Sequence, residues 1–340
     1  MNIINTIRYM GIKTNLLDEL VPAIQKITPK NGVVLDLMAG SNAVSYALKE
    51  FFTIYTNDVQ EYSYTISKAI IENQKENISA NSVKEDLFDN IQENLQKAEY
   101  NFFEKTYSDT YFSNLQCRYI DSVRYAIDKL NNEYKKDLYL FALMCAMCKV
   151  QSTPGHFAQF MPKDHPRIIP LQKMNIYNEF LEKCNNYSNL YFNKNKNRAF
   201  CSDYKDLFKK DIGHIDTIYL DSPYSQEQYS RFYHLLETLV KYDNPTVNFK
   251  AKYRDDRFQS NFCYKSKVKQ EFIYIMEFCK NNKINLVISY SNKGILDYHE
   301  LESLCQKYFN SVEVKKINYN HSTQGKGVKE LKELIIICQI

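Results

Sequence analysis

The chain alternates short apolar runs with polar stretches, and each run stops at small or acidic residues. The run in GVVLDLMAGS (residues 32–41) stops by Gly40, a helix pattern follows over 42–51, and a second strand pattern over 53–59 ends in Asn57 and Asp58. Strand, turn, helix and strand in this order open a doubly wound parallel sheet. The strand pattern returns at residues 197–204, 215–224 and 284–292.

The alternation is lost between residues 78 and 195, which are polar, helical in pattern and aromatic. A last pair of strand patterns, at 311–321 and 332–340, predicts an antiparallel hairpin at the sheet edge. We therefore expect an α/β protein in which residues 1–77 and 196–340 form a mostly parallel sheet domain. Residues 78–195 are predicted to be an inserted, largely helical region.

Composition indicates a globular protein without a membrane span. The 340 residues are 44% hydrophobic and 25% charged, and no run of about 18 apolar residues occurs. The first residues lack the pattern of a secretory signal, so we expect a cytoplasmic protein. Nine cysteines without a regular framework indicate reduced thiols. The C-x-x-C pair of Cys145 and Cys148 lies in an apolar helix pattern, which favours packing over zinc or redox chemistry, and we expect no metal.

The net charge of +4 does not by itself indicate a nucleic-acid partner. Basic residues gather between Phe249 and Gln270, where Lys and Arg outnumber Asp255 and Asp256. Such a segment can follow a phosphate backbone, or it can be an ordinary solvated loop, and the sequence leaves both interpretations open.

Acidic residues follow four of the predicted strands: Asp36 with Gly40 nearby, Asp58, Asp203 and Asp221. Acidic residues are also common in turns and helix caps, but the carboxyl ends of parallel strands share one edge, where ligands bind. The turn AGSNAVS contains neither a P-loop nor G-x-G-x-x-G. A compact glycine turn with a carboxylate after the second strand suits a nucleoside whose ribose hydroxyls bind the carboxylate. S-adenosylmethionine is one such ligand.

Five short motifs resemble the amino-methyltransferases that act on exocyclic nitrogens of DNA bases, specifically the Dam-like adenine-N6 methylases of the alpha group. RYMGIK (8–13) resembles the N-terminal motif, DLMAGS (36–41) the cofactor loop and TND (56–58) the ribose-binding acid. CSDY (201–204) resembles the strand end that meets the cofactor adenine, and DSPY (221–224) the catalytic Asp-Pro-Pro-Tyr signature. The motifs stand in the order of the alpha group, with an insertion before DSPY.

The resemblance implies a Rossmann-like sheet that binds S-adenosylmethionine and releases S-adenosylhomocysteine. It implies that Lys13 lies near the methionine carboxylate, Asp36 near the amino group, Asp58 on the ribose and Asp203 on the adenine amine. Gly40 would allow a close approach of the backbone. The matched motifs also place Tyr9, Ser41 and Tyr204 at the cofactor.

The tetrapeptide is implied to carry the chemistry. A purine draws the lone pair of its exocyclic amine into the ring, so the amine is a poor nucleophile. Asp221 and the Ser222 carbonyl would accept hydrogen bonds from this amine and align it with the methyl donor. Pro223 would fix the turn, and Tyr224 would stack on a base flipped out of the duplex.

The inserted region and the segment 243–269 are expected to read double-stranded DNA. The candidate contacts are His156, Lys163, Arg167, Tyr229, Arg231, Tyr233, Arg254 and Arg257. Arg254 and Arg257 can bind phosphates or guanine edges. His234 is expected to be a helix residue near the surface rather than a catalytic base.

The function expected is site-specific methylation of adenine N6 in duplex DNA, within a restriction-modification or phage-defence system in which a cognate restriction endonuclease is a possible partner. Cytosine-N4 methylation is an alternative, because that exocyclic amine is an equally poor nucleophile. An RNA substrate is a lesser alternative. Ser222 replaces the usual first proline of the tetrapeptide, while Met38 and Asn42 depart from the usual cofactor loop. These departures leave open a catalytically weak DNA-binding subunit that retains the fold.

Overall fold

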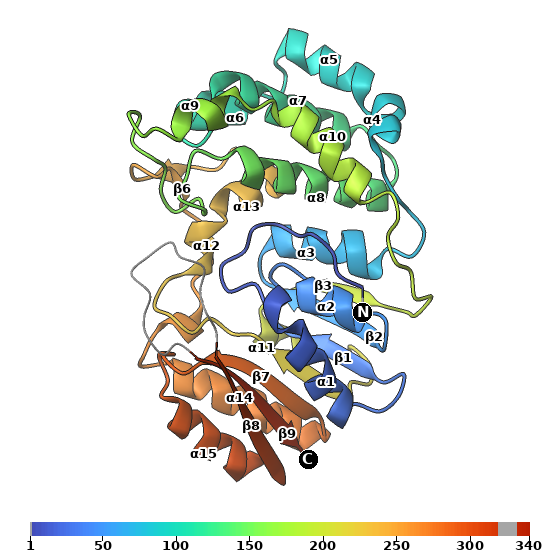
Figure 1. The fold of residues 1–340 in the computed structure, drawn as a ribbon, viewed down its shortest axis with the longest axis vertical. Coiled ribbons are helices and arrows are strands. Elements are labelled where there is room, and N and C mark those ends of the chain that lie inside the picture. The colour runs from blue at the N-terminus through green and yellow to red at the C-terminus, as the bar shows by residue number, and fades with distance from the viewer. Residues whose placement is uncertain (1, 319–331) are drawn as a thin grey trace.

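The computed structural model describes residues 2–318 and 332–340, and within them it forms a seven-stranded sheet in the order β3-β2-β1-β4-β7-β9-β8 (Figure 1). The strands β3, β2, β1, β4 and β7 are parallel, and β9 runs antiparallel to both of its neighbours. Their bounds are β1 Val33–Asp36, β2 Thr53–Asp58, β3 Arg198–Cys201, β4 Thr217–Leu220, β7 Asn285–Ser291, β8 Ser311–Asn318 and β9 Lys332–Gln339. The predicted fold class, a mostly parallel sheet with an antiparallel edge pair, is confirmed.

Each strand expected from the apolar runs is present. Side chains alternate between the two faces of a sheet, so neighbours such as Val34 and Leu35 enter different cores. Both faces are covered, which explains why these strands are continuous apolar runs rather than alternating ones. Residues 319–321, which the pattern added to the first strand of the edge hairpin, lie outside the described residues.

Helices cover both faces of the sheet. The helix α1 (Leu17–Ile27), preceded by the 3₁₀ turn η1 (Thr14–Leu16), packs on β4, β7 and β9, and α2 (Ala43–Leu48) packs beside it. The side chains of α14 (Val268–Asn282) and α15 (Tyr298–Tyr308) form the other core together with the turn of helix α11 (Tyr204–Leu207). This arrangement leaves the carboxyl ends of β1, β2, β3 and β4 on one edge of the sheet.

Helices fill the stretch between β2 and β3, and Figure 1 shows them as a layer beyond α3. The first, α3 (Glu61–Ser67), continues as the π-helix η2 (Lys68–Glu72), and helix α8 packs on both. The remaining bounds are α4 Ala80–Asp86, α5 Phe88–Lys97, α6 Phe102–Tyr107, α7 Asn114–Asp128, α8 Glu133–Val150, α9 Ile168–Lys173 and α10 Ile176–Asn186. One continuous core joins this layer to the sheet, and Cys145 and Cys148 are buried in it within α8.

The helical segment that follows β2 ends at Glu72. There the Asn73 side chain donates to the carbonyls of Ala69 and Glu76 and turns the chain. The segment 243–269, expected as an irregular loop, contains the hairpin of β5 (Val247–Asn248) and β6 (Tyr253–Arg254) and the turn η3 (Asn261–Cys263).

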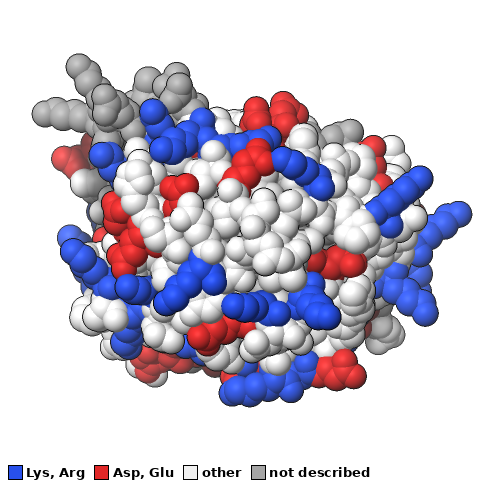
Figure 2. Space-filling model, turned by 90° about the horizontal axis from the view of Figure 1, so that it is seen from below, with Lys and Arg blue, Asp and Glu red and all other residues white. Residues whose placement is uncertain are grey.

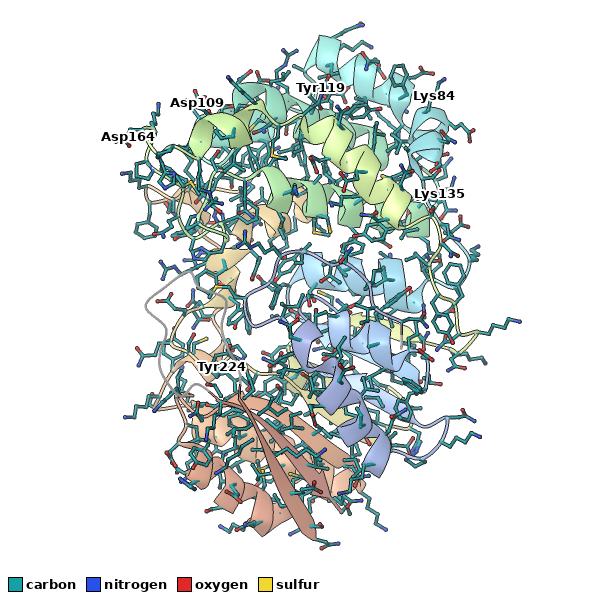
Figure 3. All side chains as sticks on the ribbon, viewed as in Figure 1. Lys84, Asp109, Tyr119, Lys135, Asp164 and Tyr224 are labelled. Atoms are coloured by element: carbon teal, nitrogen blue, oxygen red, sulfur yellow. The ribbon has the colours of Figure 1, made fainter. Side chains whose placement is uncertain are left out.

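The helices α12 (Tyr229–Phe232) and α13 (His234–Lys241) run from the end of β4 into the helical layer. Figure 3 shows Tyr224 near the sheet, whereas Asp109 and Asp164 lie at the far end of the helical layer. None of the helices in the described residues is long and apolar enough to cross a membrane.

Candidate active site

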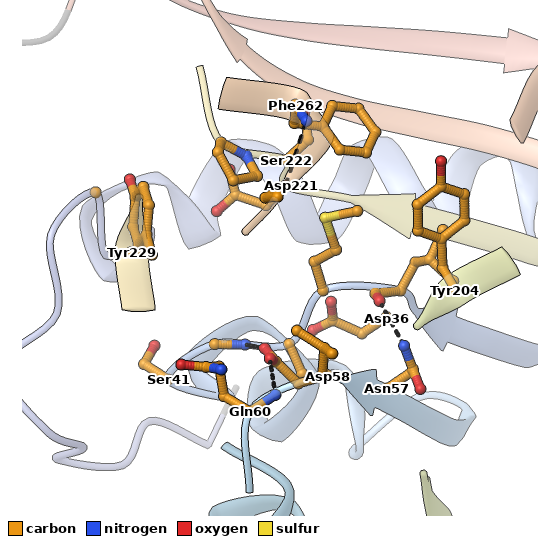
Figure 4. A pocket seen from close by; sticks show the side chains of 18 of the residues that line it. Asp36, Ser41, Asn57, Asp58, Gln60, Tyr204, Asp221, Ser222, Tyr229 and Phe262 are labelled. Atoms are coloured by element: carbon orange, nitrogen blue, oxygen red, sulfur yellow. Dashed lines mark hydrogen bonds between the residues drawn. The ribbon is translucent and has the colours of Figure 1, made fainter. Parts of the chain in front are cut away.

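A cavity of about 270 Å³ opens where the parallel strands end (Figure 4). Its lining combines the N-terminal segment, the ends of β1, β2 and β4, the turn after β3, and the segment 258–262. All four carboxylates that the sequence placed at strand ends, Asp36, Asp58, Asp203 and Asp221, line this one cavity. The shared edge of a parallel sheet therefore brings together residues that lie far apart in the sequence.

Asp58 shapes the loop after β1. The Gly40 amide donates to Asp58 Oδ2 and the Gln60 amide donates to Asp58 Oδ1, each at 2.9 Å. Gly40 has φ +50°, and a Cβ at this position would lie 2.9 Å from Cζ of the Tyr9 ring. The glycine is therefore required both by the left-handed backbone and by the ring packed against it.

Asn42, which departs from the usual cofactor loop, adopts a glycine-like conformation with φ +61°. Asn is one of the few side chains that tolerate this region. Its amide donates to the Ser63 carbonyl at 3.2 Å, and its Oδ1 accepts from Ser67 Oγ at 2.6 Å. These hydrogen bonds tie the loop after β1 to α3. Met38, the other departure, lines the cavity.

Asp36 is buried at the end of β1. Its Oδ2 accepts from Ser45 Oγ at 2.5 Å, while Oδ1 is buried and has no hydrogen-bond partner among the described residues. Burial raises the pKa of Asp36 to about 7, and the nearby carboxylates of Asp221 and Asp58 act in the same direction. An unpartnered buried oxygen facing a cavity is suited to a cationic ligand group.

The turn after β3 presents Asp203 and Tyr204 to the cavity. Asp203 caps α11 by accepting from the Lys205 amide at 2.8 Å. The Tyr204 hydroxyl donates to Glu271 on α14, and Glu271 also accepts from Lys205 Nζ at 2.7 Å. These contacts fix one wall of the cavity.

Lys13 forms an ion pair with Asp221. Its Nζ lies 3.1 Å from Asp221 Oδ1 and 3.5 Å from Oε1 of Glu333 on β9. Burial raises the pKa of Asp221, and the Lys13 ammonium opposes that shift. The two carboxylates raise the pKa of Lys13 above its ordinary value even though burial opposes them. Lys13 is therefore a charged, buried partner of the predicted catalytic carboxylate.

The other three residues of the tetrapeptide differ in their position relative to the cavity. Ser222 and Pro223 line the cavity, and the Ser222 hydroxyl is buried with no hydrogen-bond partner among the described residues. Tyr224 is not part of the lining: its ring centroid lies 5.3 Å from Lys13 Nζ, and its ring meets Tyr290 edge-on. Tyr229, expected near the DNA, does line the cavity.

A cluster of tyrosines anchors the N-terminal segment. The ring of Tyr9 stacks on Tyr233 with centroids 4.6 Å apart, and the Met10 amide donates to the Tyr233 hydroxyl at 2.6 Å. Tyr233 is only 1% exposed. This placement contradicts the expectation that Tyr233 contacts DNA, because its ring and hydroxyl are both used in holding the segment that carries Lys13.

Arg254 is likewise not available at the surface. Its side chain is 1% exposed and pairs with Asp243 at 2.7 Å and with Asp256 at 2.8 Å. The candidate phosphate contact at Arg254 is thus corrected to an internal ion pair that ties the β5–β6 hairpin to the end of α13. His234 is also corrected, since it is fully buried and its Nε2 lies 3.0 Å from the Phe157 carbonyl oxygen.

The other candidate DNA contacts remain accessible to different degrees. Lys163 and Arg167 are exposed on the segment between α8 and α9, and His156 is half-buried against Phe232. Arg231 pairs with Glu227 at 2.8 Å, and the Arg257 guanidinium lies 4.8 Å from the centroid of the Tyr253 ring. The face of the molecule in Figure 2 has interspersed Lys, Arg, Asp and Glu, and we assign no DNA contact to it.

Sequence reasoning missed several residues that complete the site. Gln228 exchanges two hydrogen bonds with the backbone of Ser260, at 2.7 and 3.1 Å, and so closes the cavity with the segment 258–262. Asn57 donates to the carbonyls of Leu37 and Ser202 and joins three strand ends. The position of Asn57 beside Asp58 was a usable signal; nothing local marked Gln228.

The sheet and the cavity at its carboxyl edge define an α/β protein of the methyltransferase-like class. Residues 9–304 match the family model of the D12 class N6 adenine-specific DNA methyltransferases, and the chain belongs to this family. The family suggested by the five motifs is therefore confirmed.

Three relatives match over most of this chain. Modification methylase LlaI of Lactococcus lactis subsp. lactis is 31% identical, and the match covers 97% of this chain and 54% of the relative. Modification methylase StsI of Streptococcus sanguinis is 29% identical, and the match covers 98% of this chain and 52% of the relative. Type II methyltransferase M2.HphI of Haemophilus parahaemolyticus is 25% identical, and the match covers 95% of this chain and 94% of the relative. The chain thus spans about half the length of the first two relatives.

Proposed function

We propose that this protein transfers a methyl group from S-adenosylmethionine to the exocyclic N6 amine of adenine in double-stranded DNA. The observation that carries the proposal is the geometry around Asp221: a carboxylate at a strand end, paired with a buried lysine, in a cavity that also contains Asp36, Asp58 and Asp203. Membership of the adenine-specific family supports the choice of base.

The cavity has donors and acceptors suited to S-adenosylmethionine. The unpartnered Oδ1 of Asp36 would accept a hydrogen bond from an ammonium group. Asp58 accepts hydrogen bonds from two backbone amides, and its remaining lone pairs could accept from ribose hydroxyls. Asp203 would accept from an adenine amine. When bound, this cofactor supplies an electrophilic methyl group on a sulfonium.

Asp221 would act on the target amine rather than on the cofactor. A carboxylate that accepts hydrogen bonds from the N6 amine favours a more tetrahedral nitrogen and increases the electron density of its lone pair. The nitrogen would form the new bond to the methyl group that the cofactor supplies, the bond from that methyl to sulfur would break, and the amine would lose one proton to Asp221 or water. The Ser222 carbonyl would be the second acceptor.

An adenine inside a duplex does not reach such a cavity, so the base would be flipped out. Tyr229 on the cavity wall and Tyr224 beside Lys13 are the aromatic faces that would replace part of the lost stacking. We propose that the helical region over residues 78–195 and the segment 243–269 read the surrounding sequence. Lys163, Arg167, Arg231 and Arg257 are the basic candidates that retain accessible surface.

We further propose that methylation protects DNA from a cognate restriction endonuclease. Two relatives are named modification methylases, and a third is named a type II methyltransferase. A cytoplasmic location would follow from such a role.

The test is transfer of radiolabelled methyl groups from S-adenosylmethionine to mixed-sequence duplex DNA. The proposal predicts acid-stable label in DNA with the wild-type chain and none with Asp221→Ala, while both proteins bind DNA equally. Saturable cofactor binding without label in DNA would contradict it, and a chain that binds no cofactor would support a non-catalytic DNA-binding role.

A further inference from the structure

Glu333 is a carboxylate at the active site that no motif predicts. It is the second residue of β9, where it pairs in register with Ser291 of β7 and Ile317 of β8, and it lies beyond residues 9–304, which match the family model. It is 3% exposed, and its Oε1 is 3.5 Å from Lys13 Nζ. Its Oε2 is buried with no hydrogen-bond partner among the described residues.

Lys13 therefore stands between two carboxylates, Asp221 at 3.1 Å and Glu333 at 3.5 Å. One ammonium group does not compensate two carboxylates, of which Glu333 is buried and Asp221 is partly buried, and a buried charge left unpaired is costly. The shorter contact is to Asp221, so in this conformation the lysine withdraws electron density from the group that must accept hydrogen bonds from the target amine. A small movement of Nζ toward Glu333 would reverse that preference.

We propose that Glu333 is a positioning residue that takes over Lys13 when the target amine enters, which leaves Asp221 free to accept hydrogen bonds from it. This inference rests on the proposed function. The lysine remains paired throughout the exchange, so no buried charge is exposed. Asp221 gains acceptor strength at the moment when the amine needs it.

The surroundings of Glu333 connect this exchange to pH. The charged and titratable groups that face it are Lys13 from the N-terminal segment and Asp221 and Tyr219 from β4. Burial raises the pKa of Glu333 to about 7, an effect that Lys13 opposes and Asp221 reinforces. Only the ionised carboxylate holds Lys13, so the exchange should weaken as the pH falls through this value.

The experiment is the pH dependence of kcat for the full chain and for Glu333→Gln. We expect the wild type to lose activity as the pH falls through about 7. The glutamine variant should lack this limb and have a plateau lower by about tenfold, with a nearly unchanged KM for the cofactor. Glu333→Asp should recover part of the plateau and keep the limb. The matched control is Glu313→Gln on β8, an exposed carboxylate paired with Lys26, which should leave the profile unchanged.

A wild-type profile without a limb near neutral pH, or a glutamine variant with the wild-type profile, would overturn the proposal.

A second measurement needs neither cofactor nor DNA. Because the folded chain binds a proton on Glu333 that the unfolded chain releases between about 4.5 and 7, the free energy of unfolding should fall over this range as pH rises. The glutamine variant should flatten that slope, and an unchanged slope would also overturn the proposal. A wild type that methylates no DNA contradicts the proposed function instead.

Discussion

Lys13 Nζ lies 3.1 Å from Asp221 Oδ1, so the N-terminal motif and the DSPY tetrapeptide meet in one ion pair, in which Lys13 is buried and Asp221 is partly buried. The stack of Tyr9 on Tyr233 and the hydrogen bond from the Met10 amide to the Tyr233 hydroxyl hold the chain just before Lys13. The position of the Asp221 carboxylate thus depends on a residue of the N-terminal segment.

Asp221→Ala should abolish methylation while leaving the binding of DNA intact. In the proposed mechanism the carboxylate acts on the amine in the transition state, and the loss of such a contact typically costs about 10²–10³ in kcat. Single-turnover methylation and fluorescence anisotropy with labelled duplex measure the two effects separately. Turnover within a factor of about three of the wild type would remove Asp221 from its proposed role.

Gly40→Ala should weaken cofactor binding, because the new Cβ would lie 2.9 Å from the Tyr9 ring and the loop carries the amide that binds Asp58. The matched control is Gly213→Ala, where φ is also positive at +85° but the nearest atom is 3.9 Å away. Calorimetric titration should show a rise of about tenfold or more in Kd for Gly40→Ala and little change for the control. Equal effects would assign the loss to backbone strain alone.

Arg257→Ala and Arg254→Ala should have different consequences although the residues are close in sequence. Arg257 keeps accessible surface, so its loss should weaken DNA binding and reduce the slope of log K against log salt by about one. Arg254 is buried between Asp243 and Asp256, so its loss should instead lower the free energy of unfolding by about 2 kcal/mol. Urea denaturation and DNA titrations at several salt concentrations distinguish the two. A reversed outcome would place Arg254, not Arg257, at the DNA.

Lys49→Met should change how stability depends on pH. Lys49 is fully buried, its Nζ donates to the Ile70 carbonyl at 2.9 Å, and burial lowers its pKa from about 10.5 to about 7. Between these values the unfolded chain binds a proton that the folded chain lacks, so the free energy of unfolding should rise with pH. The methionine variant should show a smaller rise in urea denaturation between pH 7 and 10. An unchanged slope would mean that Lys49 stays charged in the folded protein.

The sequence predicted the strand ends well because that prediction needs only local patterns. Apolar runs locate β1, β2, β3 and β4, and parallel strands share an edge, so Asp36 and Asp221 had to lie near one another. Asn42 shows a limit of motif comparison. It departs from the usual cofactor loop, yet it adopts the left-handed conformation that glycine favours and contacts α3.

Long-range pairing could not be predicted in the same way. Glu333 appears in the sequence as one more charged residue before an apolar strand, and only the antiparallel insertion of β9 beside β7 brings it to Lys13. Arg254 looked like part of a basic loop because its partner Asp243 is eleven positions away across a hairpin. Tyr233 lies in a stretch with a helix pattern, and such a pattern does not show whether a residue packs in the core or contacts DNA.

The identity of the methylated base is the measurement that distinguishes adenine-N6 methylation from its alternatives. The purified chain would be incubated with S-adenosylmethionine and mixed-sequence duplex DNA, and the DNA would be digested to nucleosides for mass spectrometry. We expect N6-methyladenine from the wild-type chain and none from Asp221→Ala. N4-methylcytosine as the product, or no methylated nucleoside from a chain that binds the cofactor, would contradict it.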